Sequence, residues 1–301
     1  MQATISFDSA SSKYTCNIDG TTFKTAKKDY IEYMYKKLSG VKKTFEEING
    51  DQAPAKKDRY SINERFGFLE KLVSMVASGV QPSAVVTGQG GLGKTFVVTK
   101  TLVAKGYTDA SDVSEMEIGS TLRKSNSFTT VKGYSTAKGM YRTLYENNGS
   151  IIIFDDCDSV LKDPVALNLL KGALDSYGKR IISWNAESRD EDLPRSFNFE
   201  GKVIFISNLT QDKIDQAIRS RSMMIDVSMN TDQKIERMEF IASESDFLPE
   251  YTTEAKLDAI ALIKELKDEA KEISLRTLIS VTKIRSSNTD WKNLATYILT
   301  A

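Results

Sequence analysis

The stretch "VVTGQGGLGKTF", residues 85–96, decides the fold, because four glycines and a lysine directly follow a short run of β-branched residues. Glycine loses more conformational freedom on ordering than any other residue, so it is kept where the backbone must turn tightly or approach a ligand closely. The stretch matches the pattern G-x-x-x-x-G-K-[ST] without a gap over residues 88–95. It therefore predicts a strand over 84–87, a phosphate-binding loop, and a helix that begins at Lys94.

The positions of this loop (the Walker A pattern) have separate predicted tasks. Its amides and the positive end of the following helix are expected to surround phosphate oxygens. Lys94 would bridge the β- and γ-phosphates, and the Thr95 hydroxyl would ligate Mg²⁺. The alternative is a glycine-rich turn that matches by chance, but the flanking strand and helix favour the loop. The predicted nucleotide contacts are Gly88, Gln89, Gly90, Gly91, Leu92, Gly93, Lys94, Thr95 and Phe96.

Composition limits the chemistry that is open to the chain. Its 301 residues suit one ATPase-sized unit with an accessory piece, or two to three modest domains. The 41 basic and 41 acidic residues cancel, which gives no overall attraction for nucleic acid. Histidine is absent, which excludes Ser-His and Cys-His nucleophiles, and two cysteines, Cys16 and Cys157, are too few for a structural zinc site and indicate reduced thiols. Catalysis must then rest on carboxylates, Lys, Arg, backbone amides and a divalent ion.

The location of the protein is predicted from two further features of the sequence. No apolar run approaches the ~18 residues that a membrane-spanning helix needs. The N-terminus also lacks the apolar region of a signal peptide. We therefore expect a soluble, cytoplasmic protein without a membrane partner, located in the host cytoplasm if a phage encodes it.

Three parts of the chain differ in pattern. Residues 1–54 predict an accessory hairpin and helix, with a turn at Asp19-Gly20 and a linker near 49–58. Residues 55–228 alternate helices with Ile/Val-rich strands, which indicates a parallel sheet covered on both faces, with one of its helices near 212–217. Residues 229–301 carry only helical periodicity. The predicted fold is α/β, a phosphate-loop parallel sheet flanked by helices, with a small N-terminal α+β region and a C-terminal helical lid over 231–242, 252–268, 274–285 and 289–300.

The stretch "SIIIFDDCD", residues 150–158, is the second nucleotide signature (Walker B). Its apolar residues predict a buried strand that ends at Asp155 and Asp156. Ligands of such sheets bind beyond the carboxyl ends of the strands, beside the glycine loop. Asp155 would hold Mg²⁺ through water, and Asp156 would orient the attacking water. The alternative is an ordinary strand end with acidic residues, which the glycine loop upstream makes less favourable.

Four further segments resemble the AAA+ ATPase family, over about residues 60–301. "VIFISN" looks like the sensor-1 strand, and the resemblance places Asn208 at the γ-phosphate and the lytic water. "DQAIRSRSMMIDV" is similar to the arginine-finger segment, with Arg221, and Arg219 as the second candidate, reaching a neighbouring subunit's nucleotide. "ISLRTLISVTKI" resembles the sensor-2 helix, with Arg276. "STAKGMYRTLYENNGSIIIFDD" has the family's spacing before the Mg²⁺ strand. AAA+ proteins of tailed phages are the most similar group, and surface roles remain the alternative for the three arginines.

The resemblance implies an ATP hydrolase that acts on the β–γ phosphoanhydride of Mg-ATP at the subunit interfaces of a ring, expected to be a hexamer. The favoured function is the remodelling of a protein client, with Gly133 and Tyr134 as candidate pore contacts and a plain strand end as the alternative. A slow, nucleotide-controlled assembly switch is a third function that stays open, because the family usually has Glu where this chain has Asp156. A carboxylate about 1 Å short of the water costs ~10²-fold in rate, unless the strand end is displaced.

A DNA-acting motor is the second function that stays open. Residues 178–202 predict a β-hairpin before the sensor-1 strand, which some DNA-translocating members share. Its tip, "ESRDEDLPR", carries four acids and two arginines, and acids repel phosphate. Trp184 either stacks on a base or packs in the core, and the core is favoured.

Overall fold

The computed structural model describes residues 3–8, 13–18, 21–40, 59–111, 126–175, 178–185, 193–244, 246–287 and 289–301. The chain forms two compact units, Met1–Tyr60 and Ser61–Ala301. The further boundary expected at residue 228 stays a prediction. The expected linker over 49–58 and the turn at Asp19-Gly20 lie outside the described residues.

The N-terminal unit is a three-stranded antiparallel sheet covered by one helix, as the small α+β prediction required. Its strands are β1 (Ala3–Asp8), β2 (Lys13–Ile18) and β3 (Thr21–Thr25), in the order β1-β2-β3. The helix α1 (Lys28–Ser39) packs Ile31 and Tyr35 against Ile5 and Cys16 of the sheet. The two cysteines of the chain are buried free thiols.

The second unit contains a six-stranded sheet whose paired strands all run parallel, which confirms the predicted α/β fold. The strand after which the phosphate loop begins, β4, is not next to the strand that ends in Asp155, β7. Instead β10 lies between them, so the residue that follows it, Asn208, emerges between the loop and the carboxylates. The strand order is β11 (Met223–Asp226), β4 (Ser83–Thr87), β10 (Lys202–Ser207), β7 (Ile151–Asp155), β6 (Ser127–Lys132) and β5 (Thr108–Asp109).

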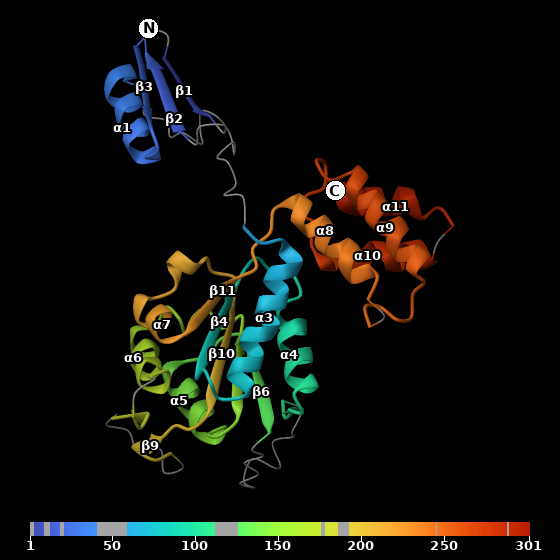
Figure 1. The fold of residues 1–301 in the computed structure, drawn as a ribbon. Helices are drawn as coiled ribbons and strands as arrows, with labels where there is room; N and C mark the ends of the chain where they lie inside the picture. Colours follow the sequence, from blue (N-terminus) through green and yellow to red (C-terminus); the bar gives the residue numbers. More distant parts are fainter. Residues whose placement is uncertain are drawn as a thin grey trace. The chain divides into compact units, whose positions relative to one another are not determined.

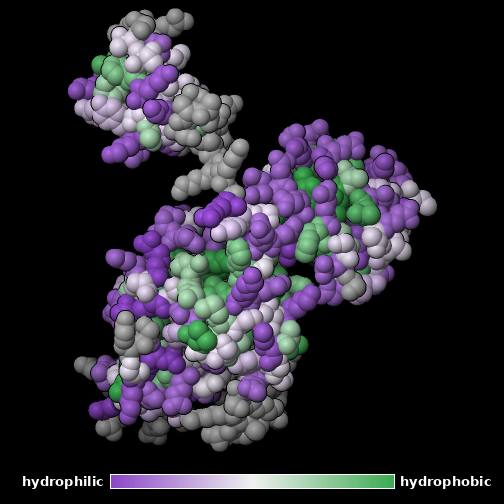
Figure 2. All heavy atoms as spheres, viewed as in Figure 1, coloured by the Kyte–Doolittle hydropathy of each residue, from purple (hydrophilic) through white to green (hydrophobic). Residues whose placement is uncertain are grey.

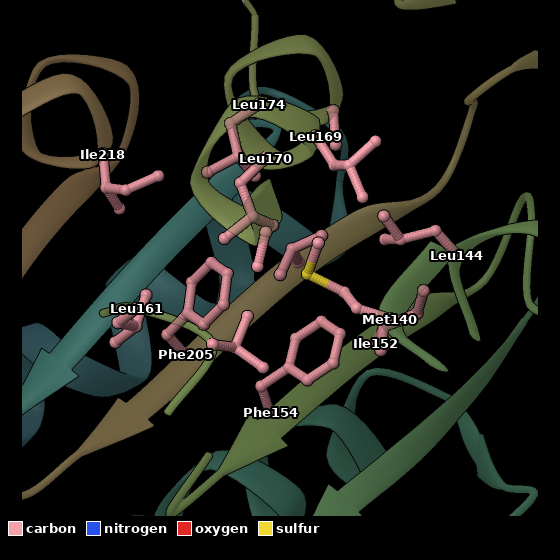
Figure 3. Packing of buried hydrophobic residues seen from close by; sticks show 14 of the residues in the cluster. Met140, Leu144, Ile152, Phe154, Leu161, Leu169, Leu170, Leu174, Phe205 and Ile218 are labelled. Carbon is pink, nitrogen blue, oxygen red and sulfur yellow. The ribbon is translucent and has the colours of Figure 1, made fainter. Parts of the chain in front are cut away.

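Helices cover both faces of this sheet, because its central strands alternate apolar side chains to both sides (Figure 1). One face packs against α3 (Ile62–Ala77) and α4 (Lys94–Ala104), through Val86, Ile153 and Ile204 among others. The other packs against α5 (Ala137–Glu146), α6 (Pro164–Ala173) and α7 (Gln216–Arg221). Figure 3 shows the core of this second face, where the rings of Phe154 and Phe205 stack with centroids 5.4 Å apart.

Four helices follow the sheet and share a core of their own, as the helical periodicity predicted. They are α8 (Thr231–Ala242), α9 (Thr253–Glu265), α10 (Leu275–Ser287) and α11 (Trp291–Thr300). Asn230 begins α8 with a capping box, in which its side chain accepts from the Gln233 amide. On the face drawn in Figure 2, hydrophilic side chains cover most of the surface, with hydrophobic ones in smaller patches.

One local prediction, for the segment before β11, differs from the structure. The helix expected near 212–217 is wrong: a 3₁₀ turn, η2 (Gln211–Lys213), ends there, and α7 begins only at Gln216. Asp215 sets that start, because its carboxylate caps α7 by accepting from the Ala217 amide at 2.8 Å.

The hairpin expected before β10 is present at its base as β8 (Ile181–Ser183) and β9 (Ser196–Asn198), which pair antiparallel. Most of its acidic tip, residues 187–192 of 187–195, lies outside the described part. Trp184 packs against the core, with its ring 6.0 Å from that of Tyr141, as the favoured alternative had it. In the described ranges, no helix combines the length and the apolar composition that crossing a membrane requires.

Candidate functional site

A cavity of about 590 Å³ lies where the phosphate loop, the ends of β7 and β10, and the C-terminal helices meet. The predicted residues that line it are Gly90, Gly91, Leu92, Gly93, Lys94, Thr95, Phe96, Asp155, Asp156, Asn208 and Arg276. The structure therefore brings together predicted residues that are up to 186 positions apart in the sequence, from Gly90 to Arg276.

The backbone of the loop explains its glycines. Gly88, Gly91 and Gly93 have φ of 146°, 70° and 84°, a region that other residues rarely adopt. Close approaches add a second reason. A Cβ on Gly93 would lie 3.0 Å from Leu275 Cδ1, and one on Gly91 would lie 3.1 Å from Ser274 Cβ. The C-terminal helices thus rest directly on the loop, and the Leu275 amide donates to the Gly91 carbonyl at 2.9 Å.

Lys94 is a buried ammonium, with 5% of its surface exposed. Its Nζ donates to the carbonyls of Gly88 and Gln89 and, at 2.9 Å, to Asn208 Oδ1. Burial lowers the pKa of Lys94, and the charges of Asp156 and Asp155 partly oppose that shift. A cation held mainly by uncharged oxygens gains most from an anionic ligand, such as a phosphate group.

Thr95 and Asp155 form the second polar pair of the cavity. The Thr95 hydroxyl lies 3.0 Å from Asp155 Oδ2, and burial raises the pKa of Asp155 despite this hydrogen bond. Among the described residues, no group of three or more Asp, Glu, Cys or His side chains forms a metal site. Mg²⁺ usually takes one or two protein ligands and completes its shell with phosphate oxygens and waters, so this pair fits it.

Asp156 has an unusual backbone, with φ of 55°. Asp and Asn are the non-glycine residues that enter the left-handed region most readily. Its carboxylate accepts a hydrogen bond from Asn208 Nδ2 at 2.7 Å. Because Asn208 Oδ1 also accepts from Lys94, this amide connects the buried cation to the carboxylate that was predicted to orient water.

The three predicted arginines have different positions. Arg276 lines the cavity, and its charge contributes to the lowered pKa of Lys94. Arg219 is exposed on α7, and Arg221 is half-buried, with its Nη1 donating to the Ala217 carbonyl of the same helix at 3.1 Å. Neither α7 arginine lines the cavity of its own chain, so their action at a neighbouring subunit's nucleotide stays a prediction.

A further wall of the cavity was missed by the sequence analysis. The helix α3 presents Asn63, Phe66, Gly67 and Glu70 to the cavity, at the i, i+3, i+4, i+7 spacing of one helix face. Arg237, Phe240 and Ile241 of α8 and Ile279 of α10 continue this wall. Gly67, a glycine within a strongly helical pattern, was the signal in the sequence that could have indicated this wall. The contact between α3 and α8 has no local signal in the sequence.

Two polar contacts connect the sheet side of the cavity to the C-terminal helices. The Gln89 side chain accepts from the Met229 amide at 3.2 Å and donates to the Met229 carbonyl at 3.5 Å. Lys100 of α4 forms an exposed ion pair with Asp246 at 2.5 Å. Exposed pairs of this kind typically contribute less than about 1 kcal/mol, so the amide contacts are the more specific link.

No family model matches the chain, and its similarity to known proteins is illustrated by two of them. An uncharacterized 36.7 kDa protein from the nrdC-mobD intergenic region of Enterobacteria phage T4 is 26% identical over 288 residues, which cover 89% of this chain and 81% of the T4 protein. The AAA domain of FIGL-1, solved in complex with ADP, is 13% identical, with a TM-score of 0.33 over 80% of this chain and 70% of that one. A TM-score this low carries no argument, and neither similarity assigns a function.

Proposed function

We propose that the chain is a Mg²⁺-dependent ATPase of the AAA+ type. The single observation that carries the proposal is the buried Lys94 ammonium at the centre of the glycine loop, beside the Thr95–Asp155 pair in the same cavity. A cation and a magnesium-type pair at one end of a parallel sheet match the requirements of a nucleoside triphosphate.

Each side chain has a task in this proposal. The loop amides, Lys94 and Arg276 bind the triphosphate, while Thr95 and Asp155 hold the metal. Mg²⁺ held by Thr95 and Asp155 would supply positive charge beside the phosphate oxygens. Asp156 polarises the attacking water, and Asn208 orients it. The Lys94 ammonium donates to Gly88, Gln89 and Asn208, so a bound phosphate would have to replace one of these three acceptors.

Release of inorganic phosphate from ATP, measured with Mg²⁺ and with a chelator in excess, tests the proposal. We expect turnover that depends on Mg²⁺, and ATP binding that tripolyphosphate displaces. A protein that binds neither ATP nor tripolyphosphate at millimolar concentration would contradict it.

We further propose that the ATPase acts in a ring on a protein client, with a DNA-acting motor or a slow assembly switch as the alternatives. Tyr134 supports the first, because this aromatic side chain is 81% exposed and follows Gly133, whose φ of 85° marks a sharp turn. The core position of Trp184 removes one reason for the DNA motor. The ATPase assay is repeated with unfolded protein, single-stranded DNA or duplex DNA added. The partner that raises the turnover of ATP shows which of these functions applies.

The position of Arg221 on α7 leads to a prediction about mixed assemblies. Arg221→Ala keeps an intact loop and lacks the finger, while Lys94→Ala keeps the finger and lacks a usable loop. We expect each variant to be inactive alone and part of the activity to return on mixing, because an Arg221→Ala subunit then receives a finger from its neighbour. A finger supplied in trans is worth ~10³-fold or more in rate, so the recovery is measurable by phosphate release.

Co-assembly of the two variants must be shown first, by pull-down of a tag carried by only one of them. If the two variants assemble together and activity does not return, Arg221 does not act in trans. If the chain stays monomeric with ATP and its specific rate of hydrolysis does not depend on protein concentration, the proposal of a ring is wrong.

Gly67 gives a prediction in which stability and binding change in opposite directions. Gly67→Ala replaces a glycine inside α3 with the best helix former, which stabilises the fold by roughly 0.5–1 kcal/mol. An added Cβ meets no described atom within 4 Å and instead occupies the cavity. We expect a higher unfolding midpoint and weaker ATP binding, with Gly172→Ala in α6 as the control that leaves binding unchanged. Unaltered affinity would show that the ligand does not approach this part of α3.

A further inference from the structure

Arg237 is a buried charge that the proposed chemistry does not use. Its side chain is 7% exposed, and its guanidinium carbon lies 4.1 Å from the ring centroid of Phe66 and 5.1 Å from that of Phe240. Nη1 donates to Asn63 Oδ1 at 2.9 Å, while the buried Nε has no hydrogen-bond partner among the described residues. A buried cation with so few partners is costly unless a ligand completes its contacts.

The surroundings of Arg237 show which ligand atoms suit this wall of the cavity. Arginine only donates hydrogen bonds, and Asn63 has its oxygen engaged by Arg237, so it presents its amide nitrogen, also a donor. Glu70 and Glu244 line the same cavity, and their charges act on Arg237, opposing the lowering of its pKa by burial. The wall therefore offers donors beside carboxylate acceptors.

The shape of this wall suits a flat group. Phe240, Ile241 and Ile279 supply apolar and aromatic surface, and Gly67 leaves the backbone of α3 uncovered. An aromatic heterocycle fits such surfaces with its faces, while its edge meets the polar groups.

We propose that Arg237 donates a hydrogen bond to N7 of an adenine base, with Glu70 or Glu244 accepting from the neighbouring exocyclic amine. Adenine places an acceptor, N7, next to a donor, the N6 amine, whereas guanine places a second acceptor, O6, next to N7. Guanine would thus direct O6 at a carboxylate, and pyrimidines lack N7. This assignment rests on the proposed function, because it names the base of the nucleotide whose phosphates the loop binds.

Equilibrium binding of ATP, 7-deaza-ATP, GTP and tripolyphosphate, by calorimetry, tests the assignment. 7-Deaza-ATP replaces N7 by a carbon and leaves the phosphates unchanged. We expect the parent protein to bind 7-deaza-ATP and GTP at least about 10-fold more weakly than ATP, the effect of losing one charge-assisted hydrogen bond. In Arg237→Met, ATP affinity should fall to the level of 7-deaza-ATP, and the difference between the two nucleotides should vanish.

Two controls keep this result specific. Arg142→Met removes a surface arginine of α5 that does not line the cavity, and should keep the parent's preference for ATP. Tripolyphosphate affinity should be equal in the parent and in Arg237→Met, which shows that the variant is folded and that its phosphate loop is intact. If Arg237→Met unfolds, Arg237→Lys retains the charge without the fork and should lose most of the preference.

The outcomes separate the base assignment from the proposed function. Equal affinity of the parent for ATP and 7-deaza-ATP, with tripolyphosphate still competing, overturns the role of Arg237 and leaves the ATPase proposal in place. An Arg237 variant that weakens both nucleotides yet still prefers ATP overturns it as well, because Arg237 then only supports the fold. Absence of binding by ATP and tripolyphosphate alike is a failure of the proposed function itself.

Discussion

We expect the Lys94→Ala variant to bind nucleotide at least about 100-fold more weakly than the parent protein. The ammonium is buried against two loop carbonyls and Asn208, where it would meet the phosphates of the proposed nucleotide away from bulk water. A hydrogen bond to a charged group contributes about 1.5–3 kcal/mol, and Lys94 would contribute to two phosphates. Its removal also leaves the carbonyls of Gly88 and Gln89 without their donor, so the loop loses its shape.

Calorimetric titration with Mg-ATP measures this loss, and Lys105→Ala is the matched control. Lys105 is an exposed lysine just after the end of the same helix, α4, and does not line the cavity. Thermal unfolding shows whether each variant is folded. Unchanged affinity in a folded Lys94→Ala protein would contradict the assignment of residues 88–95 as a phosphate loop.

Asp156→Asn should bind ATP with nearly the affinity of the parent and hydrolyse it about 10²–10⁴-fold more slowly, the usual effect of losing a general base. Asparagine tolerates the left-handed backbone that Asp156 adopts, so the fold of the strand end is retained. Single-turnover phosphate release and calorimetry measure the two effects separately. Asp268→Asn, a change at an exposed position in the turn after α9, is the control.

Asp156→Glu extends this prediction. Glutamate enters the left-handed region less readily than aspartate, and its longer side chain does not place the carboxylate where Asn208 Nδ2 holds that of Asp156. We therefore expect turnover below that of the parent, although the AAA+ ATPases that the sequence resembles usually have Glu at this position. For the Asp156→Asn variant, a rate of ATP hydrolysis equal to that of the parent would show that another group orients the water.

The parts of the fold that were predicted correctly are those whose cause is local. The glycines of residues 88–93 are required by backbone angles and close contacts, and each strand end in "SIIIFDD" and "VIFISN" follows an apolar run that no exposed loop would carry. The starts of α4 and α8 also depend on neighbouring residues. Sequence was sufficient there because the physical cause lies within a few positions.

The parts that sequence missed depend on contacts between distant segments. The wall of the cavity that carries Arg237 exists only because α8 packs on α3. This packing places Arg237 against Phe66. The sequence pattern of neither helix indicates that the two helices meet. The start of α7 was misplaced because a separate 3₁₀ turn, Gln211–Lys213, precedes it, and the α-helix begins only after the cap at Asp215. The position of Asn208 between the loop and the carboxylates follows from the strand order, which no motif encodes.

The attachment of the C-terminal helices to the loop has a geometric consequence. They are held at Gln89, which contacts Met229 just before α8, and at Gly91, which contacts Leu275 at the start of α10. The helix α8 also packs on α3, where Arg237 contacts Asn63 and Phe66, so the C-terminal helices are attached on both sides of the cavity. The exposed ion pair of Lys100 and Asp246 contributes little to this attachment. A change in the shape of the glycine loop would therefore be passed directly to the C-terminal helices, through the contacts of Gln89 with Met229 and of Gly91 with Leu275.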